Sequence, residues 1–219
     1  MIFAAGFGTR MQPLTLTTPK PLIPVAGQTL LDRTIGMAQA VNPDRIVVNA
    51  HHLAEQVEQH LSGRDIRVIH EHDRILDTGG GLKNALPHMT PGPVWAMNSD
   101  AVWKGPNPLT LMQDHWNPDI MDALLICVPI ENTRGYTRPG DIELSRTGQI
   151  TWGNSYVYGG VQIINPAVLE PFLEPVFSLK LVWDKLVDQG RAFGCVYPGL
   201  WADVGHPEGI GIAEDMLAE

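Results

Sequence analysis

Residues Ala4–Leu22, AAGFGTRMQPLTLTTPKPL, are the part of the sequence that decides the fold class. The apolar run Ile2–Ala5 leads directly into a glycine-rich turn, Gly6-Phe7-Gly8-Thr9-Arg10. Glycines let the backbone come close to a ligand, and successive N–H groups in such a turn form an anion-binding hollow. Arg10 and Lys20 add positive charge, Arg as a planar fork and Lys as a point charge. The stretch predicts a strand that ends in a phosphate-binding loop.

Two familiar phosphate-binding loops do not match this stretch. The dinucleotide fingerprint requires a third glycine where this chain has Met11, and the Walker A pattern GxxxxGK[ST] is absent from the sequence. The missing glycine argues against a dehydrogenase. From the glycines alone, a tight turn flanked by a surface Arg and a surface Lys is the simpler interpretation.

The first part of the chain alternates short apolar runs with helical patterns. The apolar runs are Ile2–Ala5, Arg45–Asn49, Ile66–His70, Val94–Asn98 and Ala123–Val128. The helical patterns are Leu30–Ala40, Leu53–Leu61, Gly81–Pro87 and Leu109–His115. This alternation predicts right-handed βαβ crossovers and a mainly parallel sheet. Ligands bind beyond the carboxyl ends of such strands, which singles out Gly6–Arg10, Asp77–Gly81 and Ser99–Asp100.

The pattern changes after residue 130. Asp141–Ile150 alternates around Thr147-Gly148 and predicts a β-hairpin. The remaining predicted elements are a strand at Tyr156–Asn165, helices at Ala167–Phe172 and Leu179–Gln189, a strand at Phe193–Tyr197 and a helix from Pro207. We expect one domain, 1–219, with a Rossmann-like three-layer α/β/α fold, a mixed, mainly parallel sheet and a small β-rich insertion. Residues 1–130 would carry the phosphate-binding loop, and residues 131–219 would form an insertion on the sheet that shapes a substrate pocket.

Composition narrows the classes of partner. The chain has 219 residues, of which 44% are hydrophobic and 18% charged, enough for one domain with a sizeable core. Its formal net charge of -9 argues against nucleic acid or a membrane surface as a partner, because both require a basic face. A small polyanion held by a few cations and a metal remains compatible with this charge.

The cysteines and the apolar stretches bear on cellular location. Cys127 and Cys195 lie in apolar runs without CxxC spacing, so two buried free thiols are expected rather than a disulfide. No stretch approaches the roughly 20 apolar residues of a membrane span. The first residues reach glycine too early for a signal peptide. These features predict a cytoplasmic protein.

The whole string Ala4–Leu22 is more specific than its glycines. It resembles, at nearly every fixed position, the signature (L)AAGxGTRxxPxTxxxPKPL of the sugar-1-phosphate nucleotidyltransferases. Further landmarks of that family follow in order: Asp77-Thr78-Gly79-Gly80-Gly81, Asn98-Ser99-Asp100 and Trp201-Ala202-Asp203-Val204-Gly205. By length and motif the chain resembles in particular the short N-acetylmuramate-1-phosphate uridylyltransferases.

The resemblance implies a role for individual residues. It implies nucleotide binding by Ala5, Gly6, Gly8, Thr9, Arg10, Gly79 and Gly80. Arg10 and Lys20 would be the catalytic cations, on the β- and γ-phosphates and on the transferring phosphoryl group. Asp100 and Asp203 would hold Mg²⁺, which typically takes one or two carboxylates plus phosphate oxygens and waters. Asn98, Gly160 and Lys180 would bind the acceptor, with Arg134 and Arg138 as further candidates for the cation on its phosphate.

Simpler interpretations stand beside several of these roles. Asp100 alone could cap the turn after a strand, and the glycine pair Gly159-Gly160 could mark a β-bulge as well as a close approach to the sugar. His51-His52 and His70-Glu71-His72 are clustered, but they match neither HExxH nor a zinc spacing. Surface or helix-cap histidines are the better interpretation.

Taken together, the sequence predicts a Mg²⁺-dependent enzyme that transfers a nucleoside monophosphate from an NTP to a sugar 1-phosphate and releases pyrophosphate. The resemblance favours UTP and N-acetylmuramate 1-phosphate, with a role in cell-wall recycling. Mannose- or glucose-1-phosphate nucleotidyltransferases that use GTP, dTTP or CTP stay open, as does a non-catalytic nucleotide-sensing relative. Because the chain ends shortly after Glu208, a monofunctional enzyme is expected, as a monomer or homodimer.

Overall fold

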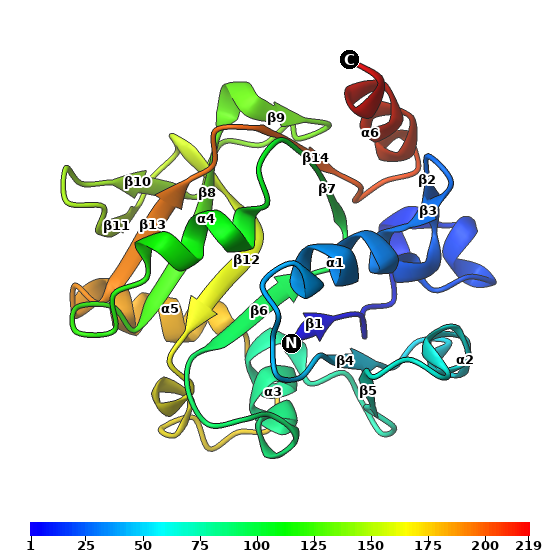
Figure 1. Cartoon of the computed structure of the whole chain (residues 1–219), viewed down its shortest axis with the longest axis horizontal. Coiled ribbons are helices and arrows are strands. Elements are labelled where there is room, and N and C mark those ends of the chain that lie inside the picture. Colours follow the sequence, from blue (N-terminus) through cyan, green and yellow to red (C-terminus); the bar gives the residue numbers. More distant parts are fainter.

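The computed structural model describes all 219 residues and is built on one central sheet (Figure 1). Its seven main strands lie side by side in the order β13, β8, β12, β6, β1, β4, β5. Their bounds are β1 Ile2–Phe3, β4 Val47–Ala50, β5 Arg67–His70, β6 Val94–Asn98, β8 Ala123–Pro129, β12 Tyr156–Ile164 and β13 Ala192–Val196. Only β12 pairs in the antiparallel sense with its main neighbours, β6 and β8. The predicted mixed, mainly parallel sheet is confirmed.

Helices cover both faces of the sheet and give the predicted three layers (Figure 1). On one face α1 (Leu30–Gln39), α2 (Ala54–Leu61) and α4 (Pro108–His115) bury apolar side chains against the strands. On the other face lie α3 (Asp77–Ala85) and α5 (Leu179–Asp188). Their amphipathic patterns explain the placement, because each helix keeps one apolar stripe to bury.

Side-chain caps set where three of these helices begin. The side-chain oxygens of Thr29, Asn107 and Ser178 accept hydrogen bonds from backbone N–H groups in the first turns of α1, α4 and α5. Such caps satisfy N–H groups that have no partner within the helix.

Most predicted helices and strands agree with the structure to within a few residues. Two helices differ. Helix α3 begins at Asp77, earlier than the predicted Gly81, because Gly79 and Gly80 are helical and packed under Pro175 and Phe177. The helix predicted at Ala167–Phe172 is a short 3-10 turn, Pro166–Leu169. Three glycines in a row suggest a loop on propensity alone, and here tertiary packing overrides that preference.

The predicted hairpin is present as β10 (Ile142–Leu144) and β11 (Ile150–Trp152), which continue the main sheet beside the start of β12. Gly148 has φ +81 in the connecting turn, a conformation that glycine adopts without strain. A second, smaller hairpin, β2 (Pro24–Val25) and β3 (Gln28–Thr29), was not predicted.

A separate three-stranded sheet was also missed by the sequence interpretation. It consists of β7 (Ala101–Lys104), β14 (Leu200–Asp203) and β9 (Thr133–Arg134), with β14 in the middle. Helix α6 (Glu208–Ala218) packs against it through Ala213 and Met216. In the antiparallel register of β7 and β14, Asp203 lies opposite Ala101, and the Val204 N–H donates to the Asp100 carbonyl at 3.0 Å. This pairing brings two distant aspartates together.

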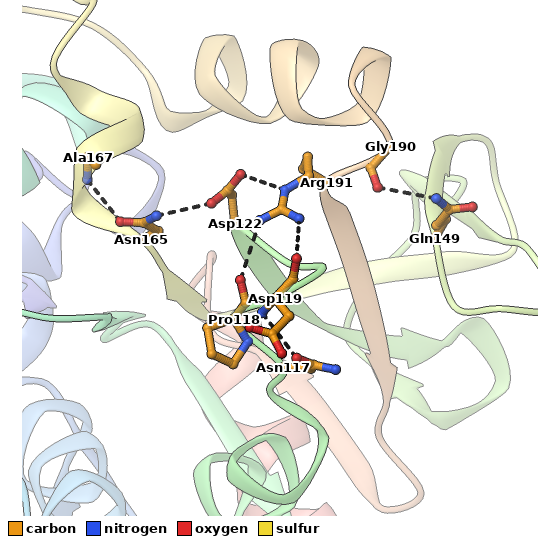
Figure 2. Close-up of polar contacts among 9 residues, drawn as sticks. All are labelled: Asn117, Pro118, Asp119, Asp122, Gln149, Asn165, Ala167, Gly190 and Arg191. Carbon is orange, nitrogen blue, oxygen red and sulfur yellow. Dashed lines mark hydrogen bonds and ion pairs between the residues drawn. The ribbon is translucent and has the colours of Figure 1, made fainter.

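Polar contacts join the chain segments at the start of β8 and β13, as Figure 2 shows. The Arg191 guanidinium donates to Asp122 Oδ2 at 2.8 Å and to the Asp119 carbonyl at 2.8 Å. Asn165 donates to the other oxygen of Asp122 at 3.0 Å. The Arg191 contact, the largest cause, holds the pKa of Asp122 below its usual range. Asp122 therefore links the segment before β8 to Arg191 before β13 and to Asn165 after β12.

The two cysteines are free and buried, as predicted. They lie on neighbouring strands, but Cys127 belongs to the core on one face of the sheet and Cys195 to the core on the other. Burial raises the pKa of Cys195 to about 11 and raises that of Cys127 further. Among the helices, none has the length and apolar composition needed to cross a bilayer.

Candidate active site

A pocket of about 340 Å³ opens at the carboxyl ends of β1 and β6, next to the start of α3. This is the edge of the sheet at which parallel strands are expected to bind ligands. Its walls include many of the predicted site residues: Ala5, Gly6, Gly8, Thr9, Arg10, Lys20, Asn98 and Asp100. The structure therefore gathers the predicted phosphate loop and one predicted metal carboxylate around one space.

The glycine-rich loop is held in shape by residues that follow it. Gly8 has φ +62, and a Cβ atom there would lie 2.8 Å from the Thr15 methyl carbon. The Thr15 hydroxyl donates to the Gly8 carbonyl at 2.9 Å. Gly6, by contrast, has no atom near the position of a Cβ, so its backbone faces open space in the pocket. Only glycine fits both the backbone angle and the contact at position 8.

Lys20 and Asp100 form the central ion pair of the site. The Lys20 ammonium lies 2.9 Å from Asp100 Oδ2, and the Lys20 side chain is only 12% exposed. Low exposure makes the pair less screened by solvent than a surface pair. Lys20 therefore lies where its charge can act on a phosphate held beside Asp100.

Asp203 lies next to this pair, at the end of β14. Burial, and then the charge of Asp100, raise the pKa of Asp203, while Lys20, Arg10 and Arg138 act in the opposite direction. Gly205 lines the pocket, and a Cβ atom there would lie 2.9 Å from Asp203 Oδ1 and 3.2 Å from an Arg10 nitrogen. The site thus combines two carboxylates that repel each other with three cations.

The donor set suits a hard divalent cation. The two acidic side chains supply oxygen ligands, and no third His, Cys, Asp or Glu completes a protein cage around them. Mg²⁺ prefers oxygen and usually keeps positions for water and substrate phosphates. A cation between these carboxylates would also offset the repulsion that raises the pKa of Asp203. The residues present therefore fit Mg²⁺.

A buried polar network beneath the pocket was not found from the sequence. Asn49 Oδ1 accepts a hydrogen bond from the Ala4 N–H at 2.9 Å, and its amide donates to Glu71 at 2.7 Å. Glu71, 4% exposed, accepts a second bond from the Leu76 N–H at 2.9 Å. The network ties the end of β1 to the start of α3. Asn49 and Glu71 each lie at the carboxyl end of a parallel strand. That position was the one feature of the sequence from which a role at the site could have been predicted.

The histidines next to this network bond to the backbone. His51 Nδ1 lies within hydrogen-bond distance of the Glu71 carbonyl, and His52 Nε2 lies 2.8 Å from the Thr15 carbonyl. The rings of His70 and His72 contact each other at a tilt of 31°, with their centroids 3.8 Å apart. The first two histidines therefore support the loops around the pocket.

Two of the predicted nucleotide-binding residues lie outside the pocket walls. Gly79 and Gly80 are buried in α3, and their N–H groups donate to the Phe177 carbonyl at 2.9 and 3.1 Å. A Cβ atom on Gly80 would overlap the Pro175 carbonyl. Asp77 and Thr78, the two residues directly before Gly79, line the pocket instead. Gly79 and Gly80 thus allow α3 to pack closely against Pro175 and Phe177, and they do not form an open loop.

The predicted acceptor residues separate into two groups. Gly160, with φ +88, lies against the Asn98 side chain that lines the pocket. The pairing of β12 with β8 shifts register between Tyr158 and Gln162, so the ladder is irregular at the two glycines. Lys180 lies on α5, paired with Asp184, outside the pocket walls.

Of the other two candidate cations, only Arg138 acts on the carboxylates. Arg138 lowers the pKa of Asp203. Arg134 instead donates to the carbonyls of Glu131 and Thr133 in its own turn. Of these two arginines, Arg138 is therefore the one that lies near the two carboxylates.

Comparison with known proteins gives consistent matches. The profile described as MobA-like NTP transferase domain matches residues 1–140. The chain is 35% identical to N-acetylmuramate alpha-1-phosphate uridylyltransferase of Caulobacter vibrioides, over 100% of this chain and 96% of that protein. It is 32% identical to the protein of the same name from Neisseria meningitidis serogroup B, over 94% and 92%. Mannose-1-phosphate guanylyltransferase 1 of Arabidopsis thaliana is 25% identical over 94% of this chain and 61% of that protein.

Solved structures share the fold at lower identity. HddC of Yersinia pseudotuberculosis, solved with GMP-PN, has a TM-score of 0.80 and 20% identity, and the match covers 99% of this chain and 97% of that one. The inositol-1-phosphate CTP transferase of T. maritima has a TM-score of 0.76 and 16% identity, over 98% and 94%. The sheet order and layers described above therefore belong to a known architecture.

Proposed function

Because the chain belongs to the sugar-1-phosphate nucleotidyltransferase family and carries a MobA-like NTP transferase domain, we propose that it transfers the uridylyl group of UTP to N-acetylmuramate 1-phosphate. The products are UDP-N-acetylmuramate and pyrophosphate. The single observation that carries the proposal is the pocket that joins the Gly6–Arg10 loop, Lys20 and Asp100, with Asp203 beside it.

The relatives favour this substrate pair over the alternatives. The two uridylyltransferases match almost from end to end at 35% and 32% identity. The mannose-1-phosphate guanylyltransferases are 22–26% identical, and the chain spans only about 60% of their length. GTP with mannose 1-phosphate is therefore the less favoured combination.

The triphosphate is proposed to bind in the glycine-rich loop. Backbone N–H groups of Gly6–Arg10 surround its phosphate oxygens, and the Arg10 guanidinium holds the β- and γ-phosphates that leave as pyrophosphate. Lys20, placed by Asp100 at 2.9 Å, neutralises charge on the α-phosphate during transfer. Fixed positive groups of this kind stabilise a transition state without needing to reorganise.

Asp100 and Asp203 are proposed to hold Mg²⁺, which supplies charge neutralisation between two phosphates that would otherwise repel each other. The acceptor phosphate is already ionised at neutral pH, so no side chain has to remove a proton from it. Arg138 draws this phosphate toward Asp203, while Asn98 and Gly160 border the sugar. Catalysis is then mainly positioning of the two substrates.

In this scheme residues 1–130 bind the nucleotide and residues 131–219 bind the sugar phosphate, with one metal carboxylate from each half. We further propose that the enzyme works in the cytoplasm, where nucleoside triphosphates are made and buried thiols such as Cys127 stay reduced. A monomer or homodimer suffices, because both carboxylates come from one chain.

The decisive test measures pyrophosphate release for a panel of NTPs against a panel of sugar 1-phosphates. UTP with N-acetylmuramate 1-phosphate is expected to give the highest kcat/KM, and EDTA is expected to abolish turnover until Mg²⁺ is restored. Asp100→Asn should lower kcat on the order of 10²–10³, comparable to loss of one charged transition-state contact. Release of pyrophosphate with no pair of substrates would refute the proposal, and full activity of Asp100→Asn would refute the metal role.

A further inference from the structure

A second cleft, of about 390 Å³, lies beside the active site and has no role in the mechanism above. It is formed between β12, the β10–β11 hairpin and α5. Three aromatic rings line it, together with one cation and one carboxylate: Trp152, Tyr158, Trp183, Lys180 and Asp141. Aromatic rings with a few charged groups are a common composition for a ligand site.

The cleft adjoins the active site at two points. Thr78 lines the active-site pocket, and its hydroxyl accepts a hydrogen bond from the Leu179 N–H, the residue before Lys180. Tyr158 lies two residues before Gly160, where an added Cβ atom would lie 3.1 Å from the Cβ of Asn98 in the pocket wall. Burial, then Cys127, and also the charge of Asp100 raise the pKa of Tyr158. The cleft and the active-site pocket are therefore neighbours, with Thr78 and Tyr158 between them.

The aromatic walls are fixed in place. The Trp183 indole N–H donates to Gln162, a fully buried side chain, at 2.8 Å. The Trp183 ring packs edge-on against Tyr158, with centroids 4.7 Å apart. Such contacts hold an aromatic ring in one rotamer, so the cleft keeps its shape without a ligand.

The cleft has one positive and one negative side chain, Lys180 and Asp141. The Lys180 ammonium lies 3.9 Å from the centre of the Trp152 ring, which keeps it at the cleft. Its partner Asp184 is on the same helix, and both side chains are about half exposed, so that ion pair is weak and easily exchanged. Asp141 accepts a hydrogen bond from the Tyr158 N–H at 3.3 Å. An anion is therefore attracted to Lys180, and a hydroxyl or amide N–H to Asp141.

Building on the proposed function, we propose that this cleft binds the part of the acceptor that lies away from its phosphate, and that Lys180 selects acceptors that carry a carboxylate. N-acetylmuramate has such a group, because a lactyl ether on its ring ends in a carboxylate. The lactyl arm reaches Lys180 and replaces Asp184 as its partner, while the acceptor's amide and hydroxyl groups face Asp141 and the aromatic rings. In a chain with a net charge of -9, a second anionic group on the acceptor needs a local cation of its own.

The test compares N-acetylmuramate 1-phosphate with its carboxamide analogue, in which the lactyl carboxylate is uncharged. The wild type is expected to have about a tenfold lower KM for the acid, because a charge-assisted hydrogen bond is replaced by a neutral one. Lys180→Gln is expected to remove this preference by raising KM for the acid, with kcat and the KM for UTP unchanged. Lys185→Gln is the control, since Lys185 is on the same helix but lies over the Phe172 ring.

Calorimetry of acceptor binding accompanies the kinetics, so the cleft is tested even if no transfer occurs. Preference for the acid in the wild type and its loss in Lys180→Gln support the assignment. Equal affinity of the wild type for acid and amide, or a preference that survives Lys180→Gln, would overturn it while leaving uridylyl transfer intact. Tight, Lys180-dependent binding of the acid without any turnover would instead refute the proposed function alone.

Discussion

At the scale of single residues, Asp203 is placed at a cost to stability. Burial and the nearby charge of Asp100 raise its pKa, so the folded chain binds a proton at this site more tightly than the unfolded chain does. Such a group weakens the fold as pH rises above about 4, the ordinary pKa of an aspartate. Placing the Asp203 carboxylate close to that of Asp100 therefore lowers the free energy of unfolding at neutral pH.

Asp203→Asn is therefore expected to gain stability and lose activity. Removing a disfavoured charge should raise Tm by a few degrees at pH 7 in the absence of metal and substrates, a shift that corresponds to about 1 kcal/mol, while uridylyl transfer falls sharply. Thermal unfolding followed by circular dichroism measures the first effect and pyrophosphate release the second. Asp65→Asn, at an exposed position, removes the same charge without burial and should leave both unchanged. A lower Tm for Asp203→Asn would contradict this account.

At the scale of the elements, α3 shows how packing can require glycine inside a helix. Gly80→Ala is expected to destabilise the fold by about 1–3 kcal/mol, because its methyl group would overlap the Pro175 carbonyl. The matched control is Gly36→Ala in α1, which has open space around it and should stabilise by about 0.5–1 kcal/mol. Urea unfolding of both variants measures the difference. Stabilisation of both variants would show that helix propensity alone governs α3.

The elements also show what the sequence could predict. Strands β4, β6 and β8 were found because buried strands are continuous apolar runs. The pocket followed from the rule about the carboxyl ends of such strands, which placed Gly6–Arg10 and Asp100 correctly. Strands β7 and β14 are four residues long, contain a Trp each and have Gly and Pro close by. They are too short to show the alternation of apolar and polar residues that identifies a strand. The Asn49–Glu71 network and the burial of Gly79 depend on contacts between distant segments, which no local pattern encodes.

At the scale of the whole molecule, the ion pair of Arg191 with Asp122 joins the segments that lead into β13 and β8. Its contact lowers the pKa of Asp122, so the stabilisation is complete above about pH 4, the ordinary pKa of the free side chain. It disappears as pH falls through the lower pKa of the folded chain. The contacts at the start of β8 and β13 are thus more sensitive to acid than the apolar core of the sheet.

Arg191→Met is expected to lower the free energy of unfolding by about 1 kcal/mol at pH 7, since charged hydrogen bonds are lost at a partly exposed site. The loss should shrink as the pH is lowered toward 3, because the wild type then loses the same contact. Urea unfolding at several pH values measures this convergence. Arg146→Met, at an exposed position, is the control. A deficit that does not change with pH would mean that Asp122 is not the partner that matters.

The pairing of β7 with β14 has a consequence for the order of events during synthesis. Asp203 reaches Asp100 only through that register, and β14 follows every strand of the main sheet in the chain. A nascent chain on the ribosome can complete the glycine loop and most of the parallel strands while the second carboxylate is still inside the exit tunnel. The two carboxylates therefore come together only after the strands of the main sheet have been made, when β14 is released and pairs with β7.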